Sequence, residues 1–356
     1  MSMKADPAAH KPGRHQAVAD GRASPLLVLF VAIMVFLAWT LSNVVLLAFG
    51  SVLVAVLLRH LARILSHWLP LPIGVSLTLV VLGLALLASL FAVSAGARVA
   101  GQFDLLWESL PRAVARAREY VASYSWGRDL LEASGPRVGT LVNLATGLAG
   151  TLVSALTDAV MVIVVALFLA ADPDPYRRGL LHLLPVARRA RGAEVLAALD
   201  QGLWHWIIGQ SIAMLCIATI TAAGLMLLGI PLALALGLLA GVLNFIPYLG
   251  PILSAAPALL IAFSQSPAHA LNTLLLFVFI QNVEGYLLTP MLQRRAVSIP
   301  PALGIFAIVG LGALFRIYGV LFATPLLLVV MILVWMLYVE DRLGGADRPA
   351  DSEAAR

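Results

Sequence analysis

The chain has 356 residues, of which 61% are hydrophobic and 12% are charged, with a net charge of +5. A soluble domain carries about 25% charged residues, and several uncharged runs here reach membrane length without alternating apolar and polar residues. The composition therefore excludes an ordinary soluble protein and a transmembrane β-barrel, and predicts an all-α, polytopic helical membrane protein.

The net positive charge has a simple source in arginine residues of loops beside a membrane. No basic patch with interleaved aromatic residues occurs, so we expect no nucleic-acid partner.

Residues 1–24 are polar and rich in Ala, Pro and Gly, which predicts a disordered cytoplasmic tail. The apolar run after this tail continues without a signal-peptide cleavage site, so we expect an uncleaved first span. Residues 23–58 contain no charged residue, and as one helix they would extend about 54 Å, too long for one crossing of about 30 Å. The polar patch at Thr40, Ser42 and Asn43 therefore predicts a break between two short spans.

The N-terminal membrane spans are assigned to residues 25–97. Basic residues at Arg59 and Arg63 mark the exit of the second span. The Leu-Pro-Leu-Pro sequence at residues 69–72 predicts a tight connection to a third span at residues 73–96.

Residues 98–136 change character, because apolar residues recur there every three or four positions with Arg, Asp and Glu between them. This spacing predicts an amphipathic helical region, extramembrane or interfacial, that packs against the membrane bundle. Ser109 before Pro111 predicts a new helix start within this region. Residues 137–171 then predict a fourth span.

Residues 172–203 form a predicted polar connector with five arginine residues. By the positive-inside rule, this connector lies in the cytoplasm with the N-terminal tail. Residues 340–356 are charged and predict a disordered C-terminal tail on the same side.

The C-terminal membrane core is predicted at residues 204–339. Between Asp200 and Arg294 lie 93 residues in which Glu284 is the single Lys, Arg, Asp or Glu. As a helix these residues would extend about 140 Å, enough for four or five crossings. We expect a fifth span at residues 204–228 and a further span at about residues 271–290.

The sequence GLLAGVLNFIPYLGPIL at residues 237–253 interrupts this core. Proline and glycine break the apolar helix, and the backbone groups that a break frees must meet protein or water, because hydrocarbon cannot satisfy them. The segment forms either two short spans or one re-entrant hairpin, and broken helices of this kind build the substrate path of many transporters. Gly237 and Gly241, one helical turn apart, predict close helix packing.

A second interrupted pair is predicted at residues 302–315 and 317–339, divided by Arg316. Interrupted or re-entrant hairpins are thus expected in the C-terminal half. The residues expected to interrupt its helices are Pro247, Gly250, Pro251, Gly285, Pro290, Gly319 and Pro325.

Glu284 is the leading functional candidate, because an acid deep in an apolar helix faces the bundle interior or a wet cavity. At about 100° per residue, Gln281, Asn282, Glu284, Gly285 and Thr289 share one polar face. Two interpretations stay open: a structural hydrogen-bonding clamp against the break near Asn244, or a carboxylate that binds a proton or a cation.

Three further residues are candidates for the substrate path. Asn244 and Tyr248 either line this path or satisfy the backbone freed at Pro247. Arg316 either snorkels to an interface or pairs with Glu284 or with an anionic cargo.

No constellation of residues indicates catalysis, so we expect neither enzyme activity nor a cofactor or metal. The seven His residues show no metal-ligand spacing with carboxylates, and there is no Walker A loop. The single cysteine, Cys216, excludes an intramolecular disulfide and is expected to be a small buried residue.

The segment at residues 237–253, QNVEGYLLTP at 281–290 and GALFRIYGVLFATP at 312–325 resemble the signature segments of the autoinducer-2 exporter family, and Gly209-Gln210 also fits. The resemblance implies a bacterial inner-membrane permease of about eight spans. It implies export of the furanone-type signal autoinducer-2 in some members and sodium/proton exchange in others.

The chain departs from the family pattern at three places near the expected path. A basic residue is usual at Ile208, Asn is common at Tyr286, and a small residue is usual at Arg316. The cargo therefore need not be that of the family's namesake.

Together these observations favour a secondary transporter that moves a small polar solute, such as an autoinducer-2-like signal, across the inner membrane, with protons or sodium as candidate coupling ions. The alternatives are a sodium/proton antiporter and a non-transporting scaffold whose polar breaks serve packing alone. The expected partners are the lipid bilayer, the solute and further copies of the chain in a homo-oligomer.

The charge bias makes a topology prediction: both tails and the 172–203 connector face the cytoplasm. Reporter fusions at Arg14, Arg189 and Glu353 should therefore all give cytoplasmic signals. A periplasmic signal from any one of the three would contradict this orientation.

Overall fold

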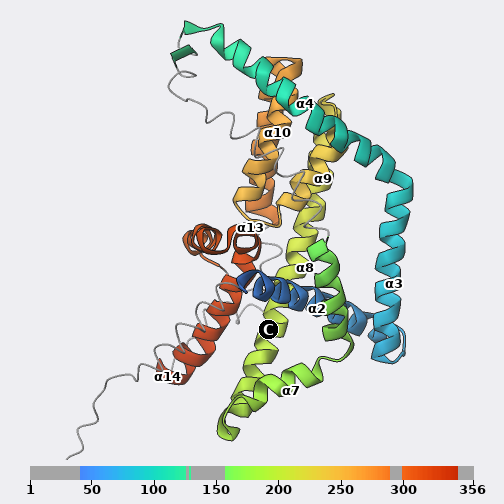
Figure 1. The fold of residues 1–356 in the computed structure, drawn as a ribbon, viewed down its shortest axis with the longest axis vertical. Helices are drawn as coiled ribbons and strands as arrows, with labels where there is room; N and C mark the ends of the chain where they lie inside the picture. Colours follow the sequence, from blue (N-terminus) through green and yellow to red (C-terminus); the bar gives the residue numbers. More distant parts are fainter. Residues whose placement is uncertain (1–40, 126–127, 130–156, 289–298, 344–356) are drawn as a thin grey trace, which may run out of the picture. The chain divides into compact units, whose positions relative to one another are not determined.

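The computed structural model of the chain describes residues 41–125, 128–129, 157–288 and 299–343. Nearly all of these residues belong to one compact unit that begins at Asn43, and every regular element in them is a helix (Figure 1). Five described helices are long and apolar enough to cross a membrane, or up to six if the bent pair Thr157–Ala171 and Asp174–His182 forms one span. The predicted all-α, polytopic fold class is confirmed.

A proline-rich connection joins the first two helices. α2 (Ser42–Trp68) begins at the predicted polar break, and α3 (Ile73–Phe91) begins directly after Pro72. Residues 69–72 thus form the predicted connection. The tail and the first span expected before α2 lie outside the described residues.

α3 continues through a π turn (Ala92–Gly96) into α4 (Ala97–Ala122). The predicted helix start at Ser109 is wrong, because Pro111 lies inside α4. The Ser109 hydroxyl instead donates to the carbonyl of Leu106, 3.1 Å away.

Packing explains why α4 continues across Pro111. Leu106, Leu110 and Ala113 of α4 form one apolar cluster with residues of α9 (Ala233–Leu243) and α10 (Leu249–Gln265). Burying each larger apolar side chain contributes about 1.5–3 kcal/mol, which together offsets the roughly 3 kcal/mol that an interior proline costs a helix.

The predicted polar connector is mostly helical. Helix Thr157–Ala171 ends where the fourth span was expected to end, and the chain then bends by 84° into α7 (Asp174–His182). A 3-10 turn (Val186–Arg188) leads into α8 (Arg189–Leu227), which has 39 residues. A helix of this length extends about 58 Å, so α8 carries a charged segment in addition to its apolar span.

α9 and α10 form an antiparallel hairpin. Leu236 near the start of α9 and Ala262 near the end of α10 belong to one buried cluster, and the chain reverses between them at residues 244–248. The 11 residues of α9 extend only about 17 Å, less than the roughly 30 Å of the hydrocarbon layer. Of the two alternatives for this segment, the geometry favours a re-entrant hairpin.

α11 (Pro267–Val283) begins four residues earlier than expected because its start is capped. The Ser266 hydroxyl accepts a hydrogen bond from the backbone N–H of His269 at 3.2 Å, and proline occupies the first helical position. The helix ends in a π turn, Glu284–Leu288.

α13 (Pro301–Val334) consists of two helical arms that meet at Arg316, where φ is 55° and ψ is −132°. The arms fold back on each other: a Cβ added at Gly312 would lie 2.7 Å from the side chain of Val320, whereas a straight helix separates residues eight apart by about 12 Å. The second interrupted pair is thus divided at the residue that the sequence indicated.

An arginine of α8 holds the end of the described chain. A π turn (Trp335–Glu340) and α14 (Asp341–Leu343) continue α13. Arg191 pairs with Glu340 at 2.7 Å and with Asp341 at 2.8 Å. The first residues of the predicted disordered tail are therefore helical, while the rest of that tail lies outside the described residues.

Cys216 is half-buried on α8, so its predicted burial is wrong. The buried stripe of α8 includes Ala213, Ile217 and Thr221, and Cys216 lies beside this stripe rather than on it. Thiol-labelling experiments therefore require its replacement.

Gly237 and Gly241 lie where α9 meets α8. A Cβ added at Gly241 would lie 2.6 Å from the Cβ of Ala218 and 2.7 Å from the carbonyl oxygen of Met214. A Cβ added at Gly237 would lie 2.8 Å from the carbonyl oxygen of Ala218. Real Cβ atoms do not come this close to backbone, so the two helices approach each other closely because these positions are glycine.

Gly241→Leu should destabilise the protein, because the backbone of α8 cannot yield to a larger side chain in a dense interior. Overpacking of this kind costs about 1–3 kcal/mol of unfolding free energy, and should lower the melting temperature in detergent. Gly83→Leu in α3 is the matched control, since no heavy atom lies within 4 Å of a Cβ added there. Equal melting temperatures for the two variants would contradict the close contact.

Candidate functional site

A glutamine of α8 supports the chain reversal between α9 and α10. The carbonyl oxygen of Asn244 accepts a hydrogen bond from Nε2 of Gln210, 2.6 Å away. Carbonyl groups at a helix end have no partner within the helix, and hydrocarbon offers none. Gln210 therefore satisfies a backbone group that the break frees.

The predicted helix-breaking residues occupy different positions in and after this reversal. Pro247 lies within it, whereas Gly250 and Pro251 lie in the first turn of α10. Proline is tolerated in a first turn because N–H groups there lack helical partners. Gly250 lies against the end of α9, since an added Cβ would be only 2.9 Å from the Cα of Asn244.

Glu284 lies on the buried stripe of α11, in register with Thr273, Phe277 and Ile280. The side-chain amide of Asn244 lies close to the carboxylate of Glu284, although the two do not form a hydrogen bond. Oε2 of Glu284 and both polar atoms of the Asn244 amide are buried without a hydrogen-bond partner among the described residues. We call Gln210, Asn244 and Glu284 the break cluster.

The predicted polar face shared with Gln281 and Asn282 is not formed. Both side chains are exposed, and Nδ2 of Asn282 donates to the carbonyl of Val278 in its own helix, 2.7 Å away. The buried stripe repeats every three or four residues and passes from Ile280 to Glu284, so Gln281 and Asn282 lie off it.

Tyr248 contacts the second interrupted pair. A Cβ added at Gly304 of α13 would lie 3.2 Å from a ring carbon of Tyr248, whose side chain is 45% exposed. Its φ of 67° lies in the left-handed region, which is strained for a residue other than glycine. Tyr248 therefore connects the first hairpin to α13.

Arg316 is exposed, and no ion pair joins it to Glu284 in the described part of the chain. Its positive φ gives a physical reason for the small residue usual at this position in the family that the sequence resembles, because glycine adopts that region most readily. Two residues further on, the hydroxyl of Tyr318 donates to the carboxylate of Asp158. Sequence reasoning missed this contact, which joins residues 160 positions apart.

The other predicted interruptions differ in their surroundings. Gly319 lies between the two arms of α13, where an added Cβ would be 2.9 Å from the Cβ of Phe315. Pro325 is buried inside the second arm. Gly285 belongs to the π turn after α11, and Pro290 lies outside the described residues.

The break cluster offers one carboxylate and two amide side chains. Such a set can bind a proton, a hydroxyl-bearing solute or a small cation, but it contains no pair of nucleophile and base. Within the described residues, no group of three or more His, Cys, Asp or Glu side chains could hold a metal ion.

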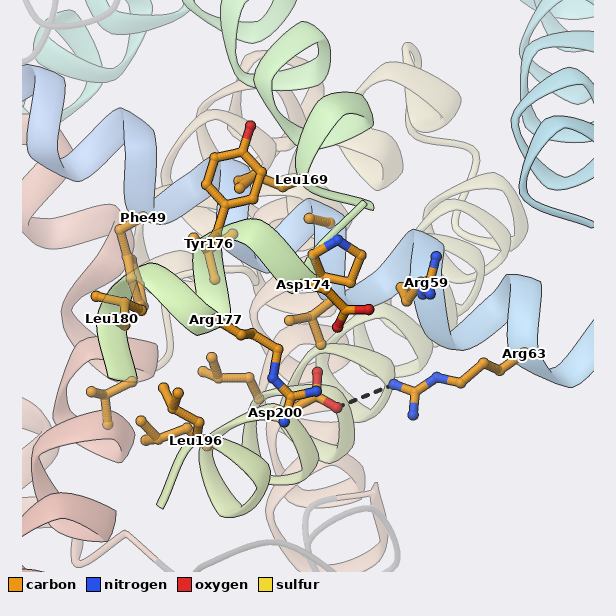
Figure 2. Close-up of a pocket in the computed structure, with 17 residues that line it drawn as sticks. Phe49, Arg59, Arg63, Leu169, Asp174, Tyr176, Arg177, Leu180, Leu196 and Asp200 are labelled. Atoms are coloured by element: carbon orange, nitrogen blue, oxygen red, sulfur yellow. Dashed lines mark hydrogen bonds and ion pairs between the residues drawn. The ribbon is translucent and has the colours of Figure 1, made fainter. Parts of the chain in front are cut away.

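A cavity of about 430 Å³ is lined by other residues, from α2, α7, α8 and α13 and from the end of helix Thr157–Ala171 (Figure 2). Arg63 of α2 pairs with Asp200 of α8 at 3.1 Å, and Nη1 of Arg59 donates to the carbonyl of Ala170 at 3.0 Å. Sequence reasoning missed this cavity because its walls come from distant segments. The concentration of arginines before α3 and after residue 171 was the available signal.

Comparison with known proteins identifies relatives along most of the chain. The family model described as AI-2E family transporter matches residues 26–338. The Mycobacterium tuberculosis protein named "Putative transport protein MT0215" is 28% identical over 314 residues, which cover 83% of this chain and 84% of that protein. The Escherichia coli K12 protein named "Putative permease PerM" is 28% identical over 181 residues, covering 49% and 51%.

A Bacillus subtilis protein named "Putative transport protein YueF" is 33% identical over 150 residues, covering 42% of this chain. The chain spans 41% of the length of YueF, so the match concerns a part of that protein. The family model, by contrast, covers far more than half of the chain.

The resemblance drawn from the three sequence segments is thereby confirmed. The apolar helices of this chain and its transporter relatives show that it is a multi-pass bacterial membrane protein in contact with the lipid bilayer. The chain belongs to the AI-2E family of permease-like transporters.

Proposed function

We propose that this chain is a secondary transporter that moves a small polar solute across the bacterial inner membrane, and that the break cluster lies on the solute path. The observation that carries the proposal is that buried polar atoms of Asn244 and Glu284 have no hydrogen-bond partner within the described part of the chain. Buried polar groups are nearly always hydrogen-bonded, and each one left unpaired costs about 1–3 kcal/mol. A bound solute, ion or water would supply the missing partners.

Glu284 is the proposed ion-binding group of this site. A protonated carboxyl group gains a donor, and among the described residues no group donates a hydrogen bond to Oδ1 of Asn244. Protonation therefore improves the hydrogen bonding of the cluster, which favours a proton as the coupling ion. Sodium is the alternative, since carboxylate and amide oxygens are cation ligands.

An autoinducer-2-like molecule fits the proposal as a cargo because it is small and rich in oxygen, which suits amide and carboxyl partners. A sodium/proton antiporter would use the same carboxylate with no organic cargo. A scaffold is the alternative from another class, and it predicts no flux at all.

We also propose a homo-oligomer. Gln281 and Asn282 are exposed on a helix that is apolar enough to cross a membrane. Polar side chains are costly against lipid, and an interface between copies of the chain would cover them.

Flux in proteoliposomes tests the function itself. A panel of autoinducer-2, sugars and cations should include at least one solute that crosses faster than in protein-free vesicles. The absence of flux for every member would favour the scaffold.

Glu284→Gln tests the coupling role, because glutamine keeps the size and hydrogen bonding of the side chain but cannot titrate. The variant should fold normally and lose the pH or sodium dependence of transport. Glu108→Gln on α4 is the matched control, since Glu108 is a mostly exposed acid outside the break cluster. If Glu284→Gln leaves both the flux and its ion dependence unchanged, Glu284 is structural.

A further inference from the structure

The cavity in Figure 2 has two chemically different sides. The figure shows the charged side chains Arg59, Arg63 and Asp174 gathered on one side, with Phe49, Leu180 and Leu196 on the other. Its volume of about 430 Å³ falls within the range of small-molecule sites. A ligand that fills this cavity must therefore be amphiphilic.

The charges of the cavity favour an anionic ligand. Three arginines and two aspartates line it, and one arginine–aspartate pair is internal, since Arg63 lies 3.1 Å from Asp200. Of the remaining charges, Arg59 and Arg177 outnumber Asp174. Arginine at such a site suits phosphate, which its planar group can bind through two hydrogen bonds.

The cavity also lies at a position where a membrane surface is expected. The chain bends by 84° between helix Thr157–Ala171 and α7, so α7 runs nearly perpendicular to an element apolar enough to enter the bilayer. Large apolar side chains of α7 and the turn after it, including Tyr176, Leu180 and Leu183, are more than half exposed. A short helix with basic and exposed apolar residues is typical of the interfacial plane.

We propose that this cavity binds an anionic glycerophospholipid from the adjacent leaflet, with the phosphate at Arg59 and Arg177 and one acyl chain against Phe49, Leu180 and Leu196. Basic pockets between membrane helices bind anionic lipid headgroups in this way. The bound lipid would contact α2, α7 and α8. This cavity does not include any residue of the break cluster.

Two neighbouring arginines of α7 provide a test variant and a matched control for the headgroup contact. Arg177 lines the cavity, whereas Arg178 does not and instead donates to the carbonyl of Asp174 in its own helix at 3.3 Å. Arg177→Ala removes a headgroup contact, Arg177→Lys keeps its charge, and Arg178→Ala removes the same charge from α7 away from the cavity. Val52 lines the cavity one helical turn from Phe49 and is 39% exposed, so Val52→Trp should occupy part of the volume proposed for the acyl chain.

The experiment is native mass spectrometry of the delipidated full chain with phosphatidylglycerol or phosphatidylcholine of identical acyl chains. The wild-type protein should retain more phosphatidylglycerol. Arg177→Ala should reduce that retention about five-fold, the effect of about 1 kcal/mol per basic residue. Arg178→Ala should retain it, and Arg177→Lys should retain more than Arg177→Ala but less than the wild-type protein, because lysine keeps the charge without the paired hydrogen bonds. Val52→Trp should reduce retention of both lipids.

Three results would overturn the proposal. Equal retention of the two lipids by the wild-type protein would exclude an anionic site, and this result does not depend on any variant folding. An equal loss in Arg177→Ala and Arg178→Ala would indicate a general charge effect. Full displacement of the lipid by glycerol 3-phosphate alone would assign the site to a free anion.

Discussion

A helix that breaks inside a membrane must find partners for the backbone groups it frees, and this requirement organises the C-terminal half of the chain. The reversal between α9 and α10 frees the carbonyl of Asn244, which the side chain of Gln210 binds at 2.6 Å. The side-chain amide of Asn244 also lies close to Glu284, the single charged residue among the 93 between Asp200 and Arg294. Asn244 therefore belongs both to the support of the chain reversal and to the candidate binding site.

Close backbone approach makes this arrangement feasible. Gly237 and Gly241 let α9 lie directly on α8, and Gly250 lets the start of α10 return beside the end of α9. Because α9 is only about 17 Å long, it is too short to cross the hydrocarbon layer. The position of the hairpin therefore depends on these contacts with neighbouring helices. The second interrupted pair uses the same device at Gly319, and Tyr248 contacts it from the first hairpin.

Sequence reasoning predicted the fold class, both interrupted pairs and the family, because proline, glycine and hydropathy act locally. It failed where contacts between residues far apart in the sequence determine the local structure. Pro111 remains helical because α4 packs on the first hairpin, and Asn282 points away because packing selects the stripe that contains Glu284. The contact of Tyr318 with Asp158 and the arginine-lined cavity both join distant segments, so spacing along the chain does not predict which residues meet there.

The central claim is that the break cluster lies on the solute path, and thiol accessibility at Asn244 tests it most directly. In a Cys216→Ser protein in proteoliposomes, a water-soluble methanethiosulfonate reagent should modify Asn244→Cys and block flux, because thiols react as thiolates, which need water. Leu275→Cys, at a position 58% exposed on α11, should face lipid and stay unmodified. An Asn244→Cys protein that transports yet never reacts would contradict the account.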